Sequence, residues 1–185
     1  MGEEKTDNEL MREFKRCSDA AYKQIVQRYE NRLFNYVLRA FGLSRDEGED
    51  VVQNTLKRVY EWKFKYVAKH AFSTWVYTIA KHFALNELQR RDSGRLVPMQ
   101  DPQEVESPDA SPLHEVDEKM RRDKLWSIVK GMKADCREVL WLLYHDGLKY
   151  KEVSGITQKK VNTLKSVAKR CLDRLRGDER VKDLV

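Results

Sequence analysis

Cysteine and proline are scarce in this chain of 185 residues, which contains three cysteines and four prolines. Cys17, Cys136 and Cys171 are odd in number, widely spaced and outside any CxxC or Cys/His pattern. A structural zinc site needs closely spaced ligands and a disulfide framework needs paired cysteines, so neither is indicated. The sequence therefore predicts three reduced thiols.

Long hydrophobic runs are also missing. No apolar stretch approaches the roughly 18 residues that span a membrane, and the N-terminal segment MGEEKTDNEL is too polar for a secretion signal. We therefore expect a cytoplasmic protein without membrane insertion.

Patterns typical of enzymes are missing as well. The sequence shows no nucleophile and base pair, no Gly-rich phosphate loop and no cluster of metal ligands. Four histidines have no evident partners: His70, His82, His114 and His145. We expect no catalytic activity, no cofactor and no metal.

Charged residues, by contrast, are abundant, at 36% of the chain against 41% hydrophobic residues. This balance favours an all-α fold of amphipathic helices with narrow apolar stripes. The net charge of +6 favours an anionic partner, although many proteins with such a charge bind no polyanion. Residues 54–95 and 149–176 each carry nine basic side chains, whereas residues 96–118 contain no Lys or Arg. The chain is charge-segmented, and two sites for a polyanion are predicted.

All four prolines fall within the acidic segment between the two basic ones. Proline inside a helix costs about 3 kcal/mol, so helices must end on either side of this segment. We interpret residues 94–117 as a linker between two domains, residues 1–93 and 118–185.

Apolar spacing predicts three helices before the linker. The first follows the N-cap Ser18 and ends at the C-cap Gly42, the second follows Ser44, and the third is capped by Ser73. The residues expected to face inward on the second and third helices are Val51, Val52, Leu56, Val59, Tyr60, Trp75, Ile79, Phe83 and Leu88.

After the linker, helices are predicted near residues 119–129, 135–145, 150–154 and 160–175. Asp146 and Gly147 break the chain after the second of them. Two short helices that end in a basic one are typical of a helix-turn-helix.

Two polar patterns stand out before the linker. Asp50, Gln53 and Asn54 project away from the inward valines of the second helix, as an ordinary solvated face also would. Aromatic and basic residues alternate over residues 60–66, a composition that suits single-stranded DNA. We assign most of the neighbouring rings to packing and residues 65–70 to base contacts.

Several motifs together resemble the extracytoplasmic-function (ECF) group of bacterial RNA polymerase sigma factors. Region 2 of that group is similar to DVVQ at 50–53 and to FSTWVY and IA within 72–80. Region 4 is similar to REVL at 137–140, YHDGL at 144–148, YKEV at 150–153, VNTLKS at 161–166 and RLR at 174–176. The resemblance covers nearly the whole chain in the family's order.

The resemblance implies a region 2 helical bundle and a region 4 helix-turn-helix domain joined by the acidic, proline-containing linker. It implies that Asp50, Gln53 and Asn54 bind the beta-prime clamp helices of core RNA polymerase. The residues implied to meet the promoter minus-ten element are Lys63, Lys65, Tyr66, Lys69, His70, Lys81 and His82. Those implied to meet the minus-thirty-five element are Lys159, Lys160, Asn162, Thr163, Lys165, Ser166, Lys169 and Arg170. The polymerase beta subunit and an anti-sigma factor are further implied partners.

Some positions depart from the family pattern. His82, Asn86 and Gln89 stand where Asn, Asp and Arg are usual, and the turn between the two region 4 helices, residues 157–160, lacks the usual glycine. The turn is therefore expected to be reshaped, or more basic and less selective. Two rival interpretations remain: a sigma-like decoy that binds polymerase or an anti-sigma factor without initiating transcription, and a helix-turn-helix repressor.

Overall fold

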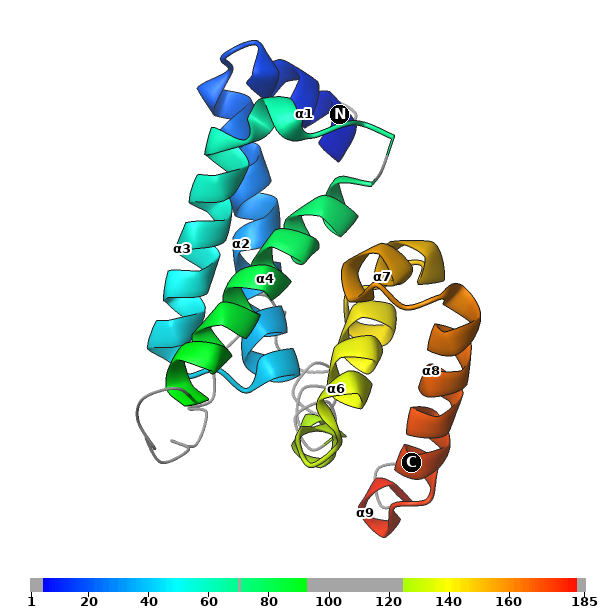
Figure 1. Ribbon diagram of the computed structural model, residues 1–185. Coiled ribbons are helices and arrows are strands. Elements are labelled where there is room, and N and C mark those ends of the chain that lie inside the picture. Colours follow the sequence, from blue (N-terminus) through cyan, green and yellow to red (C-terminus); the bar gives the residue numbers. More distant parts are fainter. Residues whose placement is uncertain (1–4, 70, 93–124, 183–185) are drawn as a thin grey trace, which may run out of the picture.

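The computed structural model describes residues 5–69, 71–92 and 125–182, and within these ranges all regular elements are helical. The N-terminal helical group contains α1 (Asp7–Lys15), α2 (Asp19–Phe41), α3 (Arg45–Glu61), the short η1 (Lys63–Lys65) and α4 (Phe72–Asp92). The C-terminal helical group contains helical residues 125–130, α6 (Ala134–Leu140), η2 (Trp141–His145), α7 (Tyr150–Thr157), α8 (Val161–Arg176) and α9 (Glu179–Lys182). The two groups lie side by side (Figure 1). The predicted linker, residues 94–117, lies outside the described residues.

The first two predicted helices begin after their predicted N-caps, and the first also ends at its predicted C-cap. Ser18 caps α2 by accepting a hydrogen bond from the backbone N–H of Ala21, and Gly42 ends the helix at a φ of 70°. Ser44 and Glu47 form a reciprocal capping box at the start of α3. Both predictions are confirmed at residue level.

The core of the N-terminal group is aromatic and aliphatic, with α2 packed against α1, α3 and α4. Leu10, Met11 and Phe14 of α1 are each at most 1% exposed. Helix α1 was not predicted from the sequence, although Thr6 and Glu9 form a capping box at its start. In the part of the chain that the structure describes, no helix combines the length and the apolar character needed to cross a membrane.

One inward assignment and one predicted N-cap were wrong. Tyr60 is 46% exposed and packs edge-on against the ring of Tyr22 at the surface. Ser73 does not cap α4, because the helix begins at Phe72 and Ser73 lies buried in its first turn. The buried side of α4 includes Val76, Tyr77, Ala80 and Ala84. This helix is covered by the N-terminal group on one side and by α7 on another, so it shows no single apolar stripe.

The C-terminal group contains the predicted helix-turn-helix, formed by α7 and α8. Gln158 ends α7 at a φ of 59°, so the turn keeps the left-handed residue that glycine usually supplies. Its side-chain amide donates to the carbonyl of Gly155 at 2.6 Å, and the Ser154 hydroxyl donates to the carbonyl of Lys159 at 2.7 Å. These bonds hold the turn despite the missing glycine.

The prediction of three reduced thiols was wrong for two cysteines. Cys136 in α6 and Cys171 in α8 form a disulfide, with their Cα atoms 5.7 Å apart. The fold brings together two residues that lie 35 positions apart, and spacing along the chain gave no sign of this contact. Cys17 is a free, exposed thiol.

Candidate functional site

The polar face of α3 is available to a partner. Asp50, Gln53 and Asn54 are all exposed, while Val51, Val52 and Thr55 are buried on the opposite side of the helix. A helix places residues three or four positions apart on the same side, which explains why the three polar side chains lie together. The structure thus presents the predicted docking residues as one solvent-facing patch.

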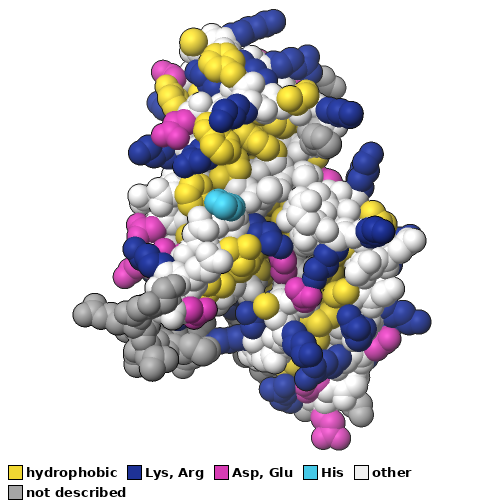
Figure 2. Space-filling view, viewed as in Figure 1, with side chains coloured by type: hydrophobic (Ala, Val, Ile, Leu, Met, Phe, Trp, Pro, Cys, Tyr) yellow, Lys and Arg dark blue, Asp and Glu magenta, His cyan; other side chains and the backbone are white. Residues whose placement is uncertain are grey.

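A second surface is formed by rings and cations where α3 ends and η1 begins. The Lys63 ammonium lies 4.7 Å from the centre of the Phe14 ring and 5.3 Å from that of Tyr60. Lys65 lies 4.2 Å from the ring centre of Trp62, and Phe64 is 70% exposed. Figure 2 shows hydrophobic and basic side chains interleaved at this upper end of the molecule. Such a surface offers both stacking faces and positive charge.

The predicted minus-ten residues differ in their exposure. Lys65, Lys69 and His82 are exposed, and Lys63 is half-buried against the rings. Tyr66 is only 2% exposed and its hydroxyl donates to Oδ1 of Asn8 at 2.5 Å, so it belongs to the core rather than to a contact surface. His70 lies outside the described residues.

Lys81 is the predicted minus-ten residue with the most unexpected position. Its ammonium donates to Oε1 of Glu138 at 2.7 Å and to Oε2 at 3.0 Å, across the boundary between the helical groups. In this arrangement Lys81 is paired with a carboxylate and is withdrawn from any DNA phosphate.

The third surface is the outer face of α8. Leu164, Val167, Ala168, Cys171 and Leu175 face the core of the C-terminal group. The exposed residues of the helix include Asn162, Thr163, Lys165, Ser166, Lys169 and Arg170, with Lys160 at the N-cap. Figure 2 shows basic side chains over the part of the molecule where α8 runs in Figure 1. Seven of the eight predicted residues are thus exposed.

Lys159 differs from the other predicted residues of this surface. It is half-buried, and its ammonium forms an ion pair with Asp135 near the start of α6. The positive charge of Lys159 in this turn is therefore balanced by a carboxylate from another helix. Lys159 is part of the turn's own structure and less available to DNA than its neighbours.

Polar side chains join the two helical groups, and the sequence analysis missed this contact. The hydroxyl of Tyr36 in α2 donates to Oε1 of Glu138 at 2.9 Å, and that of Tyr77 in α4 donates to Oδ2 of Asp146 at 2.6 Å. Ser73 donates to Oε1 of Glu152 at 2.5 Å. Burial, reinforced by these carboxylates, raises the pKa of both tyrosines well above the ordinary value.

Backbone and apolar contacts complete this boundary. Arg137 donates from Nε to the carbonyl of Ala40 at 3.2 Å, and Arg32 donates to the carbonyl of Asp146 at 3.1 Å. A Cβ atom on Gly155 of α7 would lie 2.6 Å from Cγ2 of Thr74 in α4, so the two helices approach too closely for a larger residue there. The boundary is a specific, closely packed contact.

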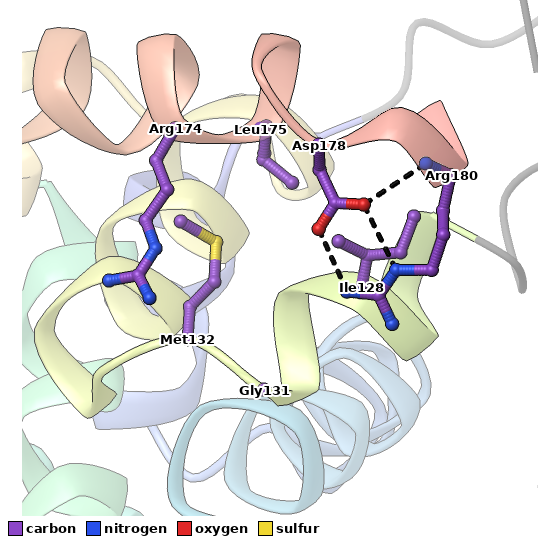
Figure 3. A pocket seen from close by; sticks show the side chains of 7 residues that line it. All are labelled: Ile128, Gly131, Met132, Arg174, Leu175, Asp178 and Arg180. Carbon is purple, nitrogen blue, oxygen red and sulfur yellow. Dashed lines mark hydrogen bonds and ion pairs between the residues drawn. The ribbon is translucent and has the colours of Figure 1, made fainter. Parts of the chain in front are cut away.

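A small pocket lies between the end of α8 and residues 128–132, with Asp178 and Arg180 paired at one side (Figure 3). Its remaining lining residues are Ile128, Gly131, Met132, Arg174 and Leu175. The hydrogen bonds from Arg180 lower the pKa of Asp178. None of the predicted contact residues lines this pocket. The exposed residues of the α3 patch and of α8 occupy outward helix faces, which suit macromolecular partners better than a small molecule.

Comparisons with known proteins agree with this arrangement. The family described as sigma-70 region 2 matches residues 25–94. The ECF RNA polymerase sigma-E factor of Haemophilus influenzae is 28% identical over 176 residues, which cover 90% of this chain and 91% of that protein.

Two solved structures share the fold. CnrH in complex with the cytosolic domain of CnrY has a TM-score of 0.67 and 18% identity, over 92% of this chain and 95% of that chain. The sigma factor RpoE in complex with the anti-sigma factor NepR, from Bartonella quintana, has a TM-score of 0.68 and 20% identity, over 87% of this chain and 96% of that chain. The order of the helices and their three-dimensional arrangement thus match those of these two solved structures.

Proposed function

This chain belongs to the extracytoplasmic-function group of RNA polymerase sigma factors, and we propose how its surfaces divide the work of promoter-specific initiation. Core polymerase binds the α3 patch of Asp50, Gln53 and Asn54. This proposal rests on one observation. The three polar side chains are exposed together on a helix whose opposite side is buried in the core. We propose the beta-prime clamp helices as the partner of this patch.

The outer face of α8 is proposed to read the minus-thirty-five element. A helix-turn-helix places its second helix in the major groove, with residues near its N-terminus closest to the base edges. Asn162 can form paired hydrogen bonds with an adenine edge, whereas Lys165, Lys169 and Arg170 neutralise phosphates. The support is the exposure of these residues and the preserved turn at Gln158.

The ring and cation surface near η1 is proposed to hold the opened minus-ten strand. Lys65, Lys69 and His82 are exposed and can contact the strand directly. Phe64 offers an exposed ring for stacking, at about 1–3 kcal/mol per base in proteins of this kind. Tyr66 is proposed to support this surface from below through its ring contact with Trp75.

The packed boundary between the helical groups suggests that the chain makes all of its minus-ten contacts only after it opens. Lys81 is engaged by Glu138 in the closed arrangement and becomes available once the groups separate. We also propose that the beta subunit contacts the C-terminal group and that an anti-sigma factor controls the chain. The second of these is supported by the similar sigma factor RpoE, which was solved with its anti-sigma factor. The chain would act in the cytoplasm, without a catalytic role of its own.

A run-off transcription assay with purified chain, core polymerase and genomic promoter fragments tests the proposal. A sigma factor gives a promoter-dependent transcript that is absent with core polymerase alone. A decoy would instead suppress transcription by another sigma factor, and a repressor would need a second sigma factor before any transcript appeared. Either of these two outcomes would contradict the proposed function.

A further inference from the structure

The C-terminal helical group contains a cysteine pair whose position suggests a role beyond promoter recognition. Cys171 is fully buried on the inner face of α8, between Ala168 and Leu175. Cys136 is half-buried near the start of α6. The bond between them ties the proposed recognition helix to the helix beside it.

Cys136 also neighbours the boundary between the helical groups. Arg137 and Glu138, the next two residues, contact Ala40, Tyr36 and Lys81 of the N-terminal group. The disulfide therefore joins the inner side of α8 to the segment of α6 that contacts the other half of the molecule. Forming or breaking this disulfide therefore affects both α8 and the α6 segment at the boundary.

A disulfide is unusual in the compartment where this chain is proposed to act. Thiols of the cytoplasm are kept reduced by glutathione and thioredoxin, and the disulfides found there are mostly transient and redox-sensing. A bond inside a DNA-binding module of this kind is therefore expected to form and break, rather than to persist as a structural staple. This inference rests on the proposed function, because the location in the cytoplasm is part of that proposal.

We propose that Cys136 and Cys171 form a dithiol oxidation site whose substrate is a peroxide. Cys136, the more accessible thiol, attacks the peroxide as its thiolate; an S–O bond forms, the O–O bond breaks, and water or an alcohol leaves. Cys171 then attacks the sulfur of this sulfenic acid, and its hydroxyl leaves as water when the disulfide forms. Two thiols lose two electrons to the peroxide, and a small dithiol reverses the reaction by exchange.

The oxidised pair constrains α8. A cross-link between α6 and α8 removes freedom from the unfolded chain without any new contact at the surface. Oxidation should therefore raise the melting temperature of the full chain by about 10 °C, given the usual contribution of a disulfide in a protein of this size. Reduction should reverse the shift.

Thiol counting on the full chain tests the site. The reduced protein is treated with hydrogen peroxide, its remaining thiols are alkylated, and peptides are identified by mass spectrometry. We expect loss of two thiols, a linked peptide pair containing Cys136 and Cys171, and an alkylated Cys17. The variant Cys17→Ser should behave in the same way, whereas Cys136→Ser should form no intramolecular bond and show no rise in melting temperature.

The opposite results overturn the proposal. Three alkylated thiols after peroxide treatment would exclude the site, and so would oxidation confined to Cys17 and dimers formed through it. An identical melting temperature for oxidised and reduced protein would exclude the stabilisation expected from this cross-link. Neither readout involves polymerase, so failure here is distinct from failure of the proposed function, which the run-off assay reports.

Discussion

Lys81 and Glu138 form an ion pair that links α4 to α6, with the ammonium 2.7 Å from one carboxylate oxygen and 3.0 Å from the other. The Lys81 side chain is 18% exposed and that of Glu138 is 8% exposed, so water screens this pair little. Tyr36 donates to the same carboxylate. A residue expected to meet DNA thus forms an ion pair between the two helical groups.

Glu138→Gln should weaken the closed arrangement. The substitution keeps the shape of the side chain but removes the charge that accepts from both Lys81 and Tyr36, at a cost of about 2 kcal/mol. This is about a 30-fold shift toward separated helical groups. Small-angle scattering should show a larger radius of gyration, and affinity for single-stranded minus-ten DNA should rise as Lys81 is released.

The matched control is Glu87→Gln, which removes a carboxylate from the ion pair with Arg90 on the same helix. Arg90 is 76% exposed, so this pair contributes little. Equal dimensions for the Glu138→Gln variant and the original protein would show that the pair does not hold the groups together.

Gly155→Ala should separate the groups by a steric route. The new methyl would lie 2.6 Å from Cγ2 of Thr74, and the β-branched threonine cannot move it away easily. Thr74→Ser removes that methyl, so the double variant should close again. Fluorescence energy transfer between labels on α3 and α8 measures the separation.

Gly131→Ala serves as the control for this substitution, because its added Cβ would meet its nearest atom at an ordinary 3.5 Å. If Gly155→Ala leaves energy transfer unchanged, or if Thr74→Ser does not restore it, the close approach of α4 and α7 does not decide whether the two helical groups stay together.

Alkaline pH should destabilise the protein through Tyr36 and Tyr77. Burial raises the pKa of both hydroxyls, so in the folded state they stay protonated while unfolded tyrosines ionise above about pH 10. The contribution of these two tyrosines to the free energy of unfolding is fully present below that pH. It is lost as the pH rises further, by about 1.4 kcal/mol per pH unit for each tyrosine. Denaturant unfolding between pH 9 and pH 11 measures the slope.

Tyr77→Phe keeps the ring and removes one ionising hydroxyl, so its slope should be smaller by the share of one tyrosine. A slope equal to that of the original protein would mean that the Tyr77 hydroxyl does not remain protonated in the fold. Comparison of the two slopes also removes the contribution of lysines that ionise in the same range.

Salt dependence should locate the minus-thirty-five surface. Each phosphate contact adds about 0.9 to the slope of log affinity against log salt for duplex DNA. Lys165→Ala and Arg170→Ala, on the exposed face of α8, should each lower the slope by that amount. Lys23→Ala, on an exposed face of α2, is the control. Unchanged slopes for the α8 variants would place the DNA surface elsewhere.

Much of the fold follows from local sequence. Ser18, Gly42 and Ser44 fix the ends of α2 and α3 through hydrogen bonds to residues at most four positions away, and such contacts are readable from spacing. The α3 patch and the outer face of α8 were predictable for the same reason, because exposure follows helical periodicity.

The remaining features depend on residues far apart in the chain. Cys136 meets Cys171, and Glu138 meets Tyr36 and Lys81, only because helices from both halves pack together. The burial of Tyr66 also depends on residues far away in the chain. Its position in a basic, aromatic segment suggested a surface role, but contacts with Asn8, Phe72 and Trp75 bury it.

The most direct test of the account is the affinity of the full chain for core polymerase, measured with a fluorescent label. Asp50→Ala combined with Gln53→Ala should raise Kd by at least about tenfold, as is usual when central interface contacts are removed. Gln27→Ala combined with Glu30→Ala removes an equivalent exposed pair from α2 and should leave Kd unchanged. Equal affinity of the two double variants, or no binding of the original chain to core polymerase, would contradict the account.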